Sequence, residues 1–305
     1  MSDSFAVYVA RRALAVVVVS VTLCALTFVM LHLLTPESFT DPRPLHVELL
    51  TYLRDVFLRL DFGSSTQRPF LPVRSMLADA LPADLSLLIG AMLVGSGLGI
   101  VGGTFCALRP GTFSTHVLQI LAAVGLCAPV YFVGFLVILL FAPSVGAPIP
   151  IPFVTVNSYQ GLGDDPVAWL RALLVPWFVA GLPLAAQCLR MIRATLPEVM
   201  TEDYVRTATA KGLAPRRIAF LHTLPVALPP TVALIGSYIP IMLANVILVE
   251  AVFGIPGIYR LIPSAVDGRN FPVLMAIVIV PSILVVVANA IADILQAALD
   301  PRVRA

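Results

Sequence analysis

The chain has 305 residues, of which 59% are hydrophobic and only 12% are charged, and its mean hydropathy is +0.97. So few charged side chains cannot cover a water-soluble domain, and the composition therefore excludes an ordinary soluble protein. The formal net charge is +2, and because the basic residues flank apolar blocks and form no separate patch, we expect no nucleic-acid binding.

Six apolar blocks follow one another along the chain. Each has about 18 residues or more with few charges, which is the length that a helix needs to cross the hydrocarbon layer of a bilayer. We therefore expect an all-α, polytopic membrane protein with six transmembrane helices. The blocks are residues 13–34, 85–108, 117–142, 172–189, 226–249 and 273–291.

The basic residues predict the orientation of these spans. Six spans place both termini on one side of the membrane. If that side is the cytoplasm, the inner segments hold eleven Lys and Arg against six Asp and Glu, and the outer segments hold eight against eleven. Cytoplasmic loops carry an excess of Lys and Arg, so we expect both termini in the cytoplasm.

The longest polar stretch lies between the first two blocks. We divide the chain into residues 1–34 (the N-terminus and first span), 35–84 (an extracytoplasmic segment) and 85–305 (a core of five spans). Within 35–84, apolar residues recur at helical spacing and predict an amphipathic helix, whose apolar face could lie on the membrane, pack on the spans or meet a partner. These residues are Leu49, Leu50, Leu53, Val56, Phe57 and Leu60.

Small residues and prolines mark several spans. The second block contains overlapping GxxxG pairs at Gly95, Gly99 and Gly103, which favour close helix packing, either within this chain or with a second subunit. Prolines inside four blocks remove intrahelical hydrogen bonds, so we expect kinks there. They are Pro129, Pro176, Pro183, Pro240 and Pro281.

The inner segment 190–225 is polar and longer than a plain connector requires. We expect Thr201 to cap a short helix whose first turn carries Glu202 and Asp203, because acidic side chains are favourable at the positive end of the helix dipole. Gly212 should end this helix, and a second one should begin near Pro215. Such a helix–turn–helix is suited to docking into another protein.

Residues 203–213 read DYVRTATAKGL, which resembles the variant DYVRTARAKGL of the inner-loop signature in peptide-type, binding-protein-dependent ABC importer permeases. The generic signature of these permeases is matched at Ala208, Gly212 and Leu224-Pro225. Further similar pieces follow in order: a basic start near Arg12, DFGSS at 61–65, PVRSML at 72–77, EAVFGIPGIYRL at 250–261 and DPRVR at 300–304. The chain departs from the branch at Leu34-Thr35-Pro36-Glu37, where Leu-Pro-Gly-Asp-Pro is usual, and at Val226, where Asn is usual.

The resemblance implies a MetI-like permease fold in a bacterial plasma (inner) membrane. It implies four kinds of partner besides the lipid bilayer: a second homologous permease, two ATP-binding subunits, an extracytoplasmic solute-binding protein and a peptide substrate. Relatives of this branch also carry nickel complexes, haem or glutathione, and these remain alternative substrates.

By the same resemblance, the inner loop docks into the ATPase subunit as a coupling helix. Tyr204 and Ala208 would make apolar contacts, Arg206 and Lys211 polar ones, and Gly212 the turn. The whole expected coupling set is Glu202, Asp203, Tyr204, Arg206, Thr207, Ala208, Lys211, Gly212 and Leu213.

Ionisable residues in spans are the places to seek a transport path. Glu250 lies at the outer end of the fifth block near Phe253 and Pro256, so these three residues could meet substrate, the binding protein or simply the water interface. Asp293, with Asn289 one turn earlier, is expected to form a structural hydrogen bond between helices.

Several kinds of chemistry are excluded by missing motifs. A phosphate-binding loop needs GxxxxGK[ST], and the only lysine is Lys211, preceded by Ala210, so ATP with Mg²⁺ would be used by partner subunits. HExxH, GxSxG and clustered metal ligands are absent from the sequence, so we expect neither an enzyme nor a bound metal or cofactor. Few carboxylates in spans and no clear internal repeat disfavour an ion-coupled secondary transporter.

Overall fold

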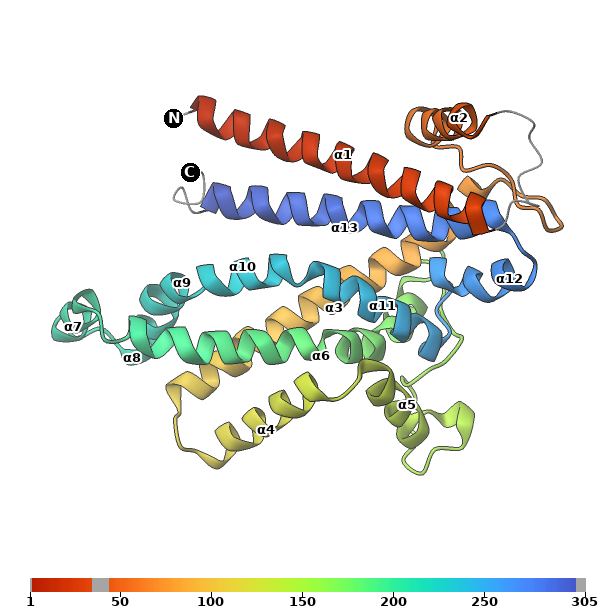
Figure 1. The fold of residues 1–305 in the computed structure, drawn as a ribbon. Helices are drawn as coiled ribbons and strands as arrows, with labels where there is room; N and C mark the ends of the chain where they lie inside the picture. The colour runs from red at the N-terminus through yellow and green to blue at the C-terminus, as the bar shows by residue number, and fades with distance from the viewer. Residues whose placement is uncertain (1, 35–43, 300–305) are drawn as a thin grey trace. The chain divides into compact units, whose positions relative to one another are not determined.

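The computed structural model describes residues 2–34 and 44–299, and these residues are helical apart from turns and connecting loops. The chain forms two compact units: Met1–Leu85 with Ile255–Ala305 (unit 1), and Ser86–Gly254 (unit 2). The sequence-based division starts the core at residue 85, one residue before unit 2, and it places residues 255–305 in the core, whereas the structure groups them with unit 1. Figure 1 shows the helices with the labels used below.

Unit 1 pairs the first and last helices of the chain. α1 and α13 pack against each other, and the start of α1 lies beside the end of α13 (Figure 1). The elements of this unit are α1 (Ser2–Leu34), α2 (Leu45–Arg59), the start of α3 (Val73–Leu108), the 3₁₀ turn η4 (Ile258–Leu261), α12 (Ile262–Asp267) and α13 (Phe271–Leu299).

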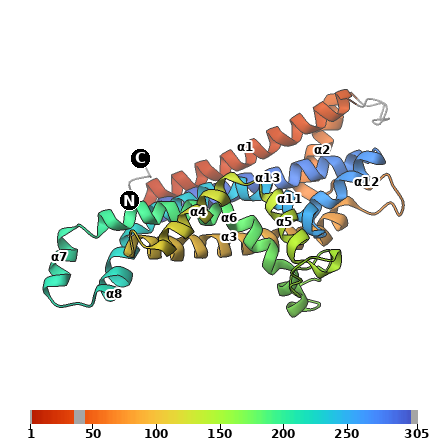
Figure 2. The ribbon, with the colours of Figure 1, turned by 90° about the horizontal axis from the view of Figure 1, so that it is seen from below.

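Unit 2 is built around α6 (Pro166–Val199), which packs against α4, α5, α10 and α11 and also contacts α3. The other elements are α4 (Phe113–Cys127), α5 (Val130–Phe141), η2 (Pro143–Val145), α7 (Asp203–Ala210), α8 (Pro215–Arg217), η3 (Ile218–Thr223), α9 (Leu224–Ala227), α10 (Pro229–Ser237) and α11 (Ile239–Phe253). α7 and α8 extend from one end of this unit in both ribbon views (Figures 1 and 2).

Four described helices are long and apolar enough to cross a membrane, and up to seven spans result if each of three bent helix pairs counts as one. The six expected spans fall within this range. The four helices are Val7–Leu33, Val73–Leu108, Pro166–Val199 and Phe271–Ala292. The all-α, polytopic class expected from the sequence is therefore confirmed.

Two expected spans are not continuous helices. The block 117–142 divides into α4 and α5, which meet at an angle of 114°. Pro129 is the reason, because it lacks an N–H and disfavours helical geometry at Ala128, and both residues have extended backbone. The block 226–249 divides similarly into α9, α10 and α11, and α11 runs on to Phe253.

The amphipathic helix expected in 35–84 is α2, and its apolar side packs within unit 1. Val56 is buried, and Tyr52 stacks on Phe28 of α1 with ring centroids 5.1 Å apart. Leu49, Leu53 and Phe57 pack against the same apolar cluster, whereas Leu50 remains exposed. Packing on the chain itself, one of three alternatives for this face, is the arrangement that the structure contains.

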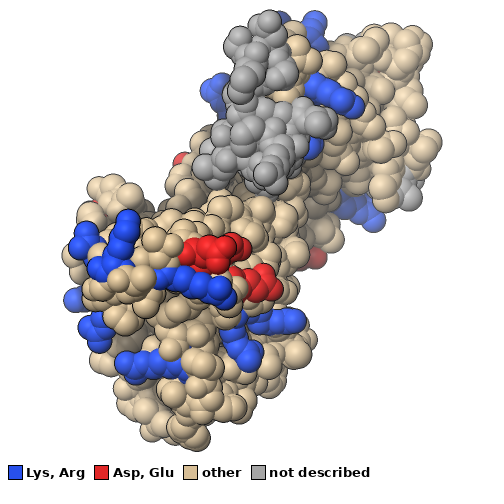
Figure 3. Space-filling model, turned by 90° about the vertical axis from the view of Figure 1, so that its left-hand side faces the viewer, with Lys and Arg blue, Asp and Glu red and all other residues tan. Residues whose placement is uncertain are grey.

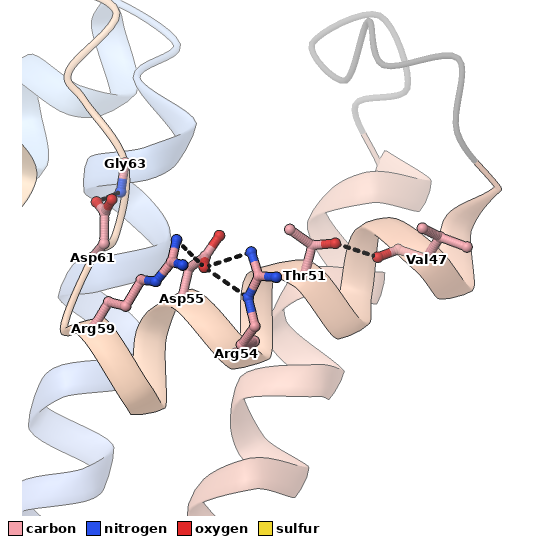
Figure 4. A network of polar contacts seen from close by, with 7 residues as sticks. All are labelled: Val47, Thr51, Arg54, Asp55, Arg59, Asp61 and Gly63. Atoms are coloured by element: carbon pink, nitrogen blue, oxygen red, sulfur yellow. Dashed lines mark hydrogen bonds and ion pairs between the residues drawn. The ribbon is translucent and has the colours of Figure 1, made fainter.

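α2 also carries a charged network outside its packed side (Figure 4). The Arg54 guanidinium donates to Asp55 Oδ1 at 3.0 and 3.1 Å, and Arg59 Nη1 lies 3.4 Å from the same oxygen. These side chains are exposed or half-exposed, so the network contributes little to stability, about 0–1 kcal/mol per pair. It keeps this face of α2 in contact with water.

Buried polar groups tie two of the segments that carry the family resemblance to other parts of unit 1. At the end of the DFGSS segment, Ser65 Oγ accepts from Asn270 Nδ2 at 2.7 Å, and the next residue, Thr66, donates its N–H to Asn270 Oδ1 at 3.2 Å. Near the GIPGIYRL segment, the Ile258 N–H donates to buried Asp84 Oδ2 at 2.9 Å. Buried polar groups of this kind fix one arrangement of a loop, because leaving any of them unpaired is costly.

The GxxxG glycines of α3 are packed within unit 2 against α6. A Cβ added at Gly95 would lie 2.6 Å from the carbonyl oxygen of Gly181, and one added at Gly103 would lie 2.8 Å from Cβ of Ile192. Gly99 approaches Ala185 and Cys188 in the same way. Of the two partners that the sequence left open, the chain's own α6 is therefore the one in contact.

We expect Gly99→Ala to destabilise the protein by about 1–3 kcal/mol, because the added methyl group would lie 2.5 Å from the Ala185 carbonyl oxygen and force the two helices apart. Gly97→Ala is the matched control, since Gly97 lies two residues away in the same helix with no atom within 4 Å of its added Cβ. Thermal unfolding in detergent measures both variants. Equal melting temperatures for the two would contradict close α3–α6 packing.

Candidate functional site

The inner loop begins where α6 ends at Val199. The Thr201 hydroxyl donates to the Glu198 carbonyl at 2.7 Å, so it turns back toward α6 and does not cap the next helix. The N-cap of α7 is Glu202, which has extended backbone and makes no side-chain capping bond. The expectation that Thr201 is the cap was wrong, because its hydroxyl already bonds the carbonyl three residues earlier.

α7 ends in a tight glycine turn. Gly212 has φ +76°, and its N–H donates to the Thr209 carbonyl at 2.9 Å, while the Leu213 N–H reaches the Ala208 carbonyl at 3.3 Å. No atom lies within 4 Å of a Cβ added at Gly212. The turn therefore favours glycine because of its positive φ and not for lack of space.

A single buried side chain holds α7 on the rest of the loop. Val205 is 6% exposed, and α7 packs against the π-helical turn η3. The Tyr204 hydroxyl also reaches the His222 carbonyl at 3.5 Å. Isolated helices shorter than about 12–15 residues are marginal in water, so an 8-residue helix depends on such contacts. Burial of one valine supplies about 1.5–3 kcal/mol.

The segment after Gly212 returns the chain to the end of α6. α8 begins at Pro215, as expected, and η3 and α9 follow without a break. Ala227 packs with Ile192 and Leu196 of α6, and the Thr195 hydroxyl contacts the Ala227 carbonyl at 3.3 Å. Inside η3, buried Thr223 donates to the Ala219 carbonyl at 2.9 Å. α7 thus rests on a base formed by α8, η3 and α9, and this base packs on the end of α6 through Ala227.

Most of the expected coupling residues face solvent. Asp203 and Arg206 form an ion pair of 3.6 Å with side chains 98% and 76% exposed, so the pair is available to a partner and adds little stability here. Ala208 and Leu213 are half-buried, and the remaining residues are exposed: Glu202, Tyr204, Thr207, Lys211 and Gly212. Figure 3 views the protein from the side on which α7 and α8 lie in Figure 1. It shows many Lys and Arg side chains around a smaller acidic group.

Sequence reasoning missed Val205 as the residue that anchors α7. The signal was present, because Val205 is the one aliphatic residue larger than alanine between Asp203 and Ala210. The backbone contact of His222 had no sequence signal, since the two partners are 18 residues apart and one of them is a carbonyl group.

The second group of expected site residues lies inside the chain. Glu250 and Phe253 of α11 are each 2% exposed, so a protein docking on this conformation would reach neither side chain. Gly254, with φ +67°, ends α11, and the Phe253 carbonyl accepts from the Asn157 N–H at 2.9 Å. Pro256 belongs to unit 1 and is half-buried. Of Asp293, only the backbone within α13 is described.

No group of three or more His, Cys, Asp or Glu is placed to hold a metal ion within the described part of the chain. The candidate site is thus the exposed α7 with its glycine turn.

A comparison with protein families supplies the decisive observation. Residues 99–305 match the family described as "Binding-protein-dependent transport system inner membrane component". The chain belongs to this family. The match covers more than half of this permease and includes α6, α7, Gly212 and the whole returning segment.

Curated relatives extend the similarity to almost the whole permease. The chain is 32% identical over 261 residues to a probable peptide ABC transporter permease of Sinorhizobium fredii, and the alignment covers 86% of this chain and 81% of the relative. The chain is 29% identical over 318 residues to an oligopeptide transport system permease of Bacillus subtilis, and that alignment covers 98% of this chain and 99% of the relative. The suspected family resemblance is thereby confirmed.

A solved structure supports the fold. The permease aligns with a chain of the MetNI methionine ABC transporter, in an inward-facing conformation, with a TM-score of 0.56 and 17% identity. The alignment covers 77% of the permease and all of the other chain. At this identity the likeness establishes the MetI-like fold alone.

Proposed function

We propose that this permease is one of two transmembrane subunits of an ATP-driven importer of dipeptides or oligopeptides. The second subunit is a homologous permease, two partner subunits bind and hydrolyse ATP with Mg²⁺, and an extracytoplasmic binding protein delivers the peptide. The permease binds no cofactor of its own.

The observation that carries this proposal is the form of the inner loop. α7 is anchored by Val205 on one side and exposed on the other, and it ends in a rigid turn that gives it one position. Such a helix transmits a push from a docked partner to the end of α6, because the segment that follows Gly212 packs there through Ala227. Closure of the ATPase pair then moves the spans as rigid bodies, with α7 as the coupling helix.

The coupling contacts follow from exposure. Tyr204 offers an aromatic face, and Arg206 and Lys211 offer positive charge to the ATPase subunit. Ala208 is half-buried, so its contact with a partner would be small. In the proposed membrane topology, α7 and both chain termini lie in the cytoplasm. The excess of Lys and Arg in the inner segments supports this orientation.

Peptides are the proposed substrates because the similar curated proteins are named as peptide, dipeptide and oligopeptide permeases. Glu250, Phe253 and Pro256 remain our candidates for the path or for the binding-protein contact, and the burial of the first two favours a role that appears only when the spans rearrange.

The test is ATP-dependent uptake by vesicles that contain the permease with its partner subunits and binding protein. We expect a labelled dipeptide or oligopeptide to accumulate, and unlabelled peptides to compete better than glutathione, haem or a nickel complex. Accumulation that persists without the ATPase subunits would refute the proposal and favour an ion-coupled transporter.

A further inference from the structure

An open pocket of about 620 Å³ lies within unit 2, between the end of α3 and the segment that returns from α7. Its walls are largely apolar and include Val101, Phe105 and Leu108 of α3 and Phe220 of η3. Val101 is 70% exposed and Phe220 is 51% exposed. Apolar side chains exposed together around a cavity indicate a site for an apolar ligand.

The charged residues that line this pocket are both arginines, Arg109 and Arg216. Neither guanidinium has an ion-pair partner in the described part of the chain, and no Asp or Glu lines the pocket there. The Arg109 guanidinium carbon lies 5.2 Å from the ring centroid of Phe105, which keeps this charge beside the apolar wall. The pocket therefore suits a ligand with an apolar body and an anionic group.

A third observation is a buried polar atom at the same pocket. Thr104 lines the pocket, is 4% exposed, and its hydroxyl has no hydrogen-bond partner among the residues that the structure describes. An unpaired buried hydroxyl costs free energy, so it indicates a missing partner that carries a polar atom. An ester group between acyl chain and headgroup supplies such an acceptor.

We propose that this pocket binds an anionic diacyl phospholipid of the cytoplasmic leaflet. The acyl chain lies along Val101, Phe105 and Phe220, the phosphate pairs with Arg109 and Arg216, and Thr104 donates to an ester oxygen. The leaflet assignment rests on the proposed topology, in which the end of α3 meets the cytoplasmic surface. Basic pockets between transmembrane helices on that side recognise anionic headgroups.

The position of the pocket gives the lipid a role. Arg216 belongs to α8 and Phe220 to η3, the base on which α7 rests, whereas Arg109 and Val101 belong to α3. A lipid bound to both parts ties the base of the coupling helix to a span. We therefore expect bound anionic lipid to strengthen the coupling of ATP hydrolysis to transport.

The test is lipid retention by the purified importer complex in neutral detergent, measured by native mass spectrometry. Phosphatidylglycerol and phosphatidylcholine with identical acyl chains are the probes. We expect preferential retention of phosphatidylglycerol. In the double variant Arg109→Gln/Arg216→Gln, we expect its affinity to fall roughly 25-fold, at about fivefold per arginine. Phosphatidylcholine retention should not change in that variant.

Three controls make the result specific. Arg217→Gln removes the charge next to Arg216 at a residue that does not line the pocket, and it should leave retention unchanged. Val101→Trp fills the pocket without changing charge and should lower retention of both lipids. Inorganic phosphate should not displace phosphatidylglycerol, since a site for free phosphate needs no acyl chain.

The proposal is overturned if both lipids bind equally to the unmodified complex, if Arg217→Gln causes the same loss as the double variant Arg109→Gln/Arg216→Gln, or if inorganic phosphate displaces the lipid. Cysteine cross-linking from Val101→Cys to another subunit would overturn it too, by showing that protein covers the pocket. Because retention is read without peptide uptake, a failed uptake assay with intact lipid binding would refute the transport proposal alone.

Discussion

Gly212→Pro is expected to abolish ATP-dependent uptake while the permease still inserts into membranes. The backbone at Gly212 has φ +76°, whereas the proline ring fixes φ near −65°, so the turn after α7 cannot form. The substitution also removes the hydrogen bond of 2.9 Å to the Thr209 carbonyl. Without this turn, α7 loses its position relative to its base, and we expect uptake to fall by at least about tenfold, as vesicle transport assays would measure.

Gly146 provides a matched control for this substitution. Its φ is +73°, its N–H donates to a carbonyl three residues earlier at 3.2 Å, and no atom lies within 4 Å of an added Cβ. It lies in the loop after α5, which we place on the opposite side of the membrane from α7. We expect Gly146→Pro to keep most of the uptake. We also expect Gly212→Asn to keep much of the uptake that Gly212→Pro loses, because asparagine tolerates positive φ. Equal losses at Gly146 and Gly212 would contradict a coupling role for the turn.

Val205→Asp is expected to release the ATPase subunits from the permease. Val205 is the buried side chain of α7, which packs against η3, and a carboxylate in its place would be buried without a partner or would pull α7 away from its base. Either result removes at least the free energy that burial of Val205 contributes to holding α7 on its base, roughly 1.5–3 kcal/mol. The other contacts of an 8-residue helix cannot make up this loss. Co-purification of the ATPase subunits in detergent measures the effect.

Two further variants separate anchoring from charge. Val205→Ile keeps an aliphatic side chain at this position and should retain the ATPase subunits. Ala210→Asp adds the same charge at the exposed end of α7 and should weaken co-purification far less than Val205→Asp. If Ala210→Asp released the subunits as fully as Val205→Asp, repulsion between charges would explain the loss, and the anchoring role of Val205 would be wrong.

The sequence predicted those features whose signals are local. The short helix before Gly212, the restart at Pro215 and the amphipathic α2 each depend on a cap, a turn or a periodicity within a few residues. Thr201 shows the limit of this reasoning, because a threonine near a helix start can bond either forward or backward. The structure has the backward bond, to Glu198, and sequence alone does not rank the two.

Features that depend on distant segments were not predictable from a single sequence. Pro129 predicted a kink, but whether α4 and α5 bend slightly or meet at 114° depends on how both helices pack against α6. The bond between Asn270 and Ser65 joins residues 205 positions apart. The GxxxG pattern in α3 predicted close packing without naming α6 as the partner, because small residues are equally suited to any helix.

The π-helical turn η3 makes this loop sensitive to length. A π-turn holds about one residue more than an α-turn, and η3 lies directly between α8 and α9. Loss of one residue from Ile218–Thr223 would let the segment continue as an ordinary α-helix. It would also rotate α8 and α7, which precede η3, by about 100° around the helix axis. Val205 would then face away from its contact. Gene variants in this family are therefore expected to tolerate substitutions in η3 more readily than single-codon deletions.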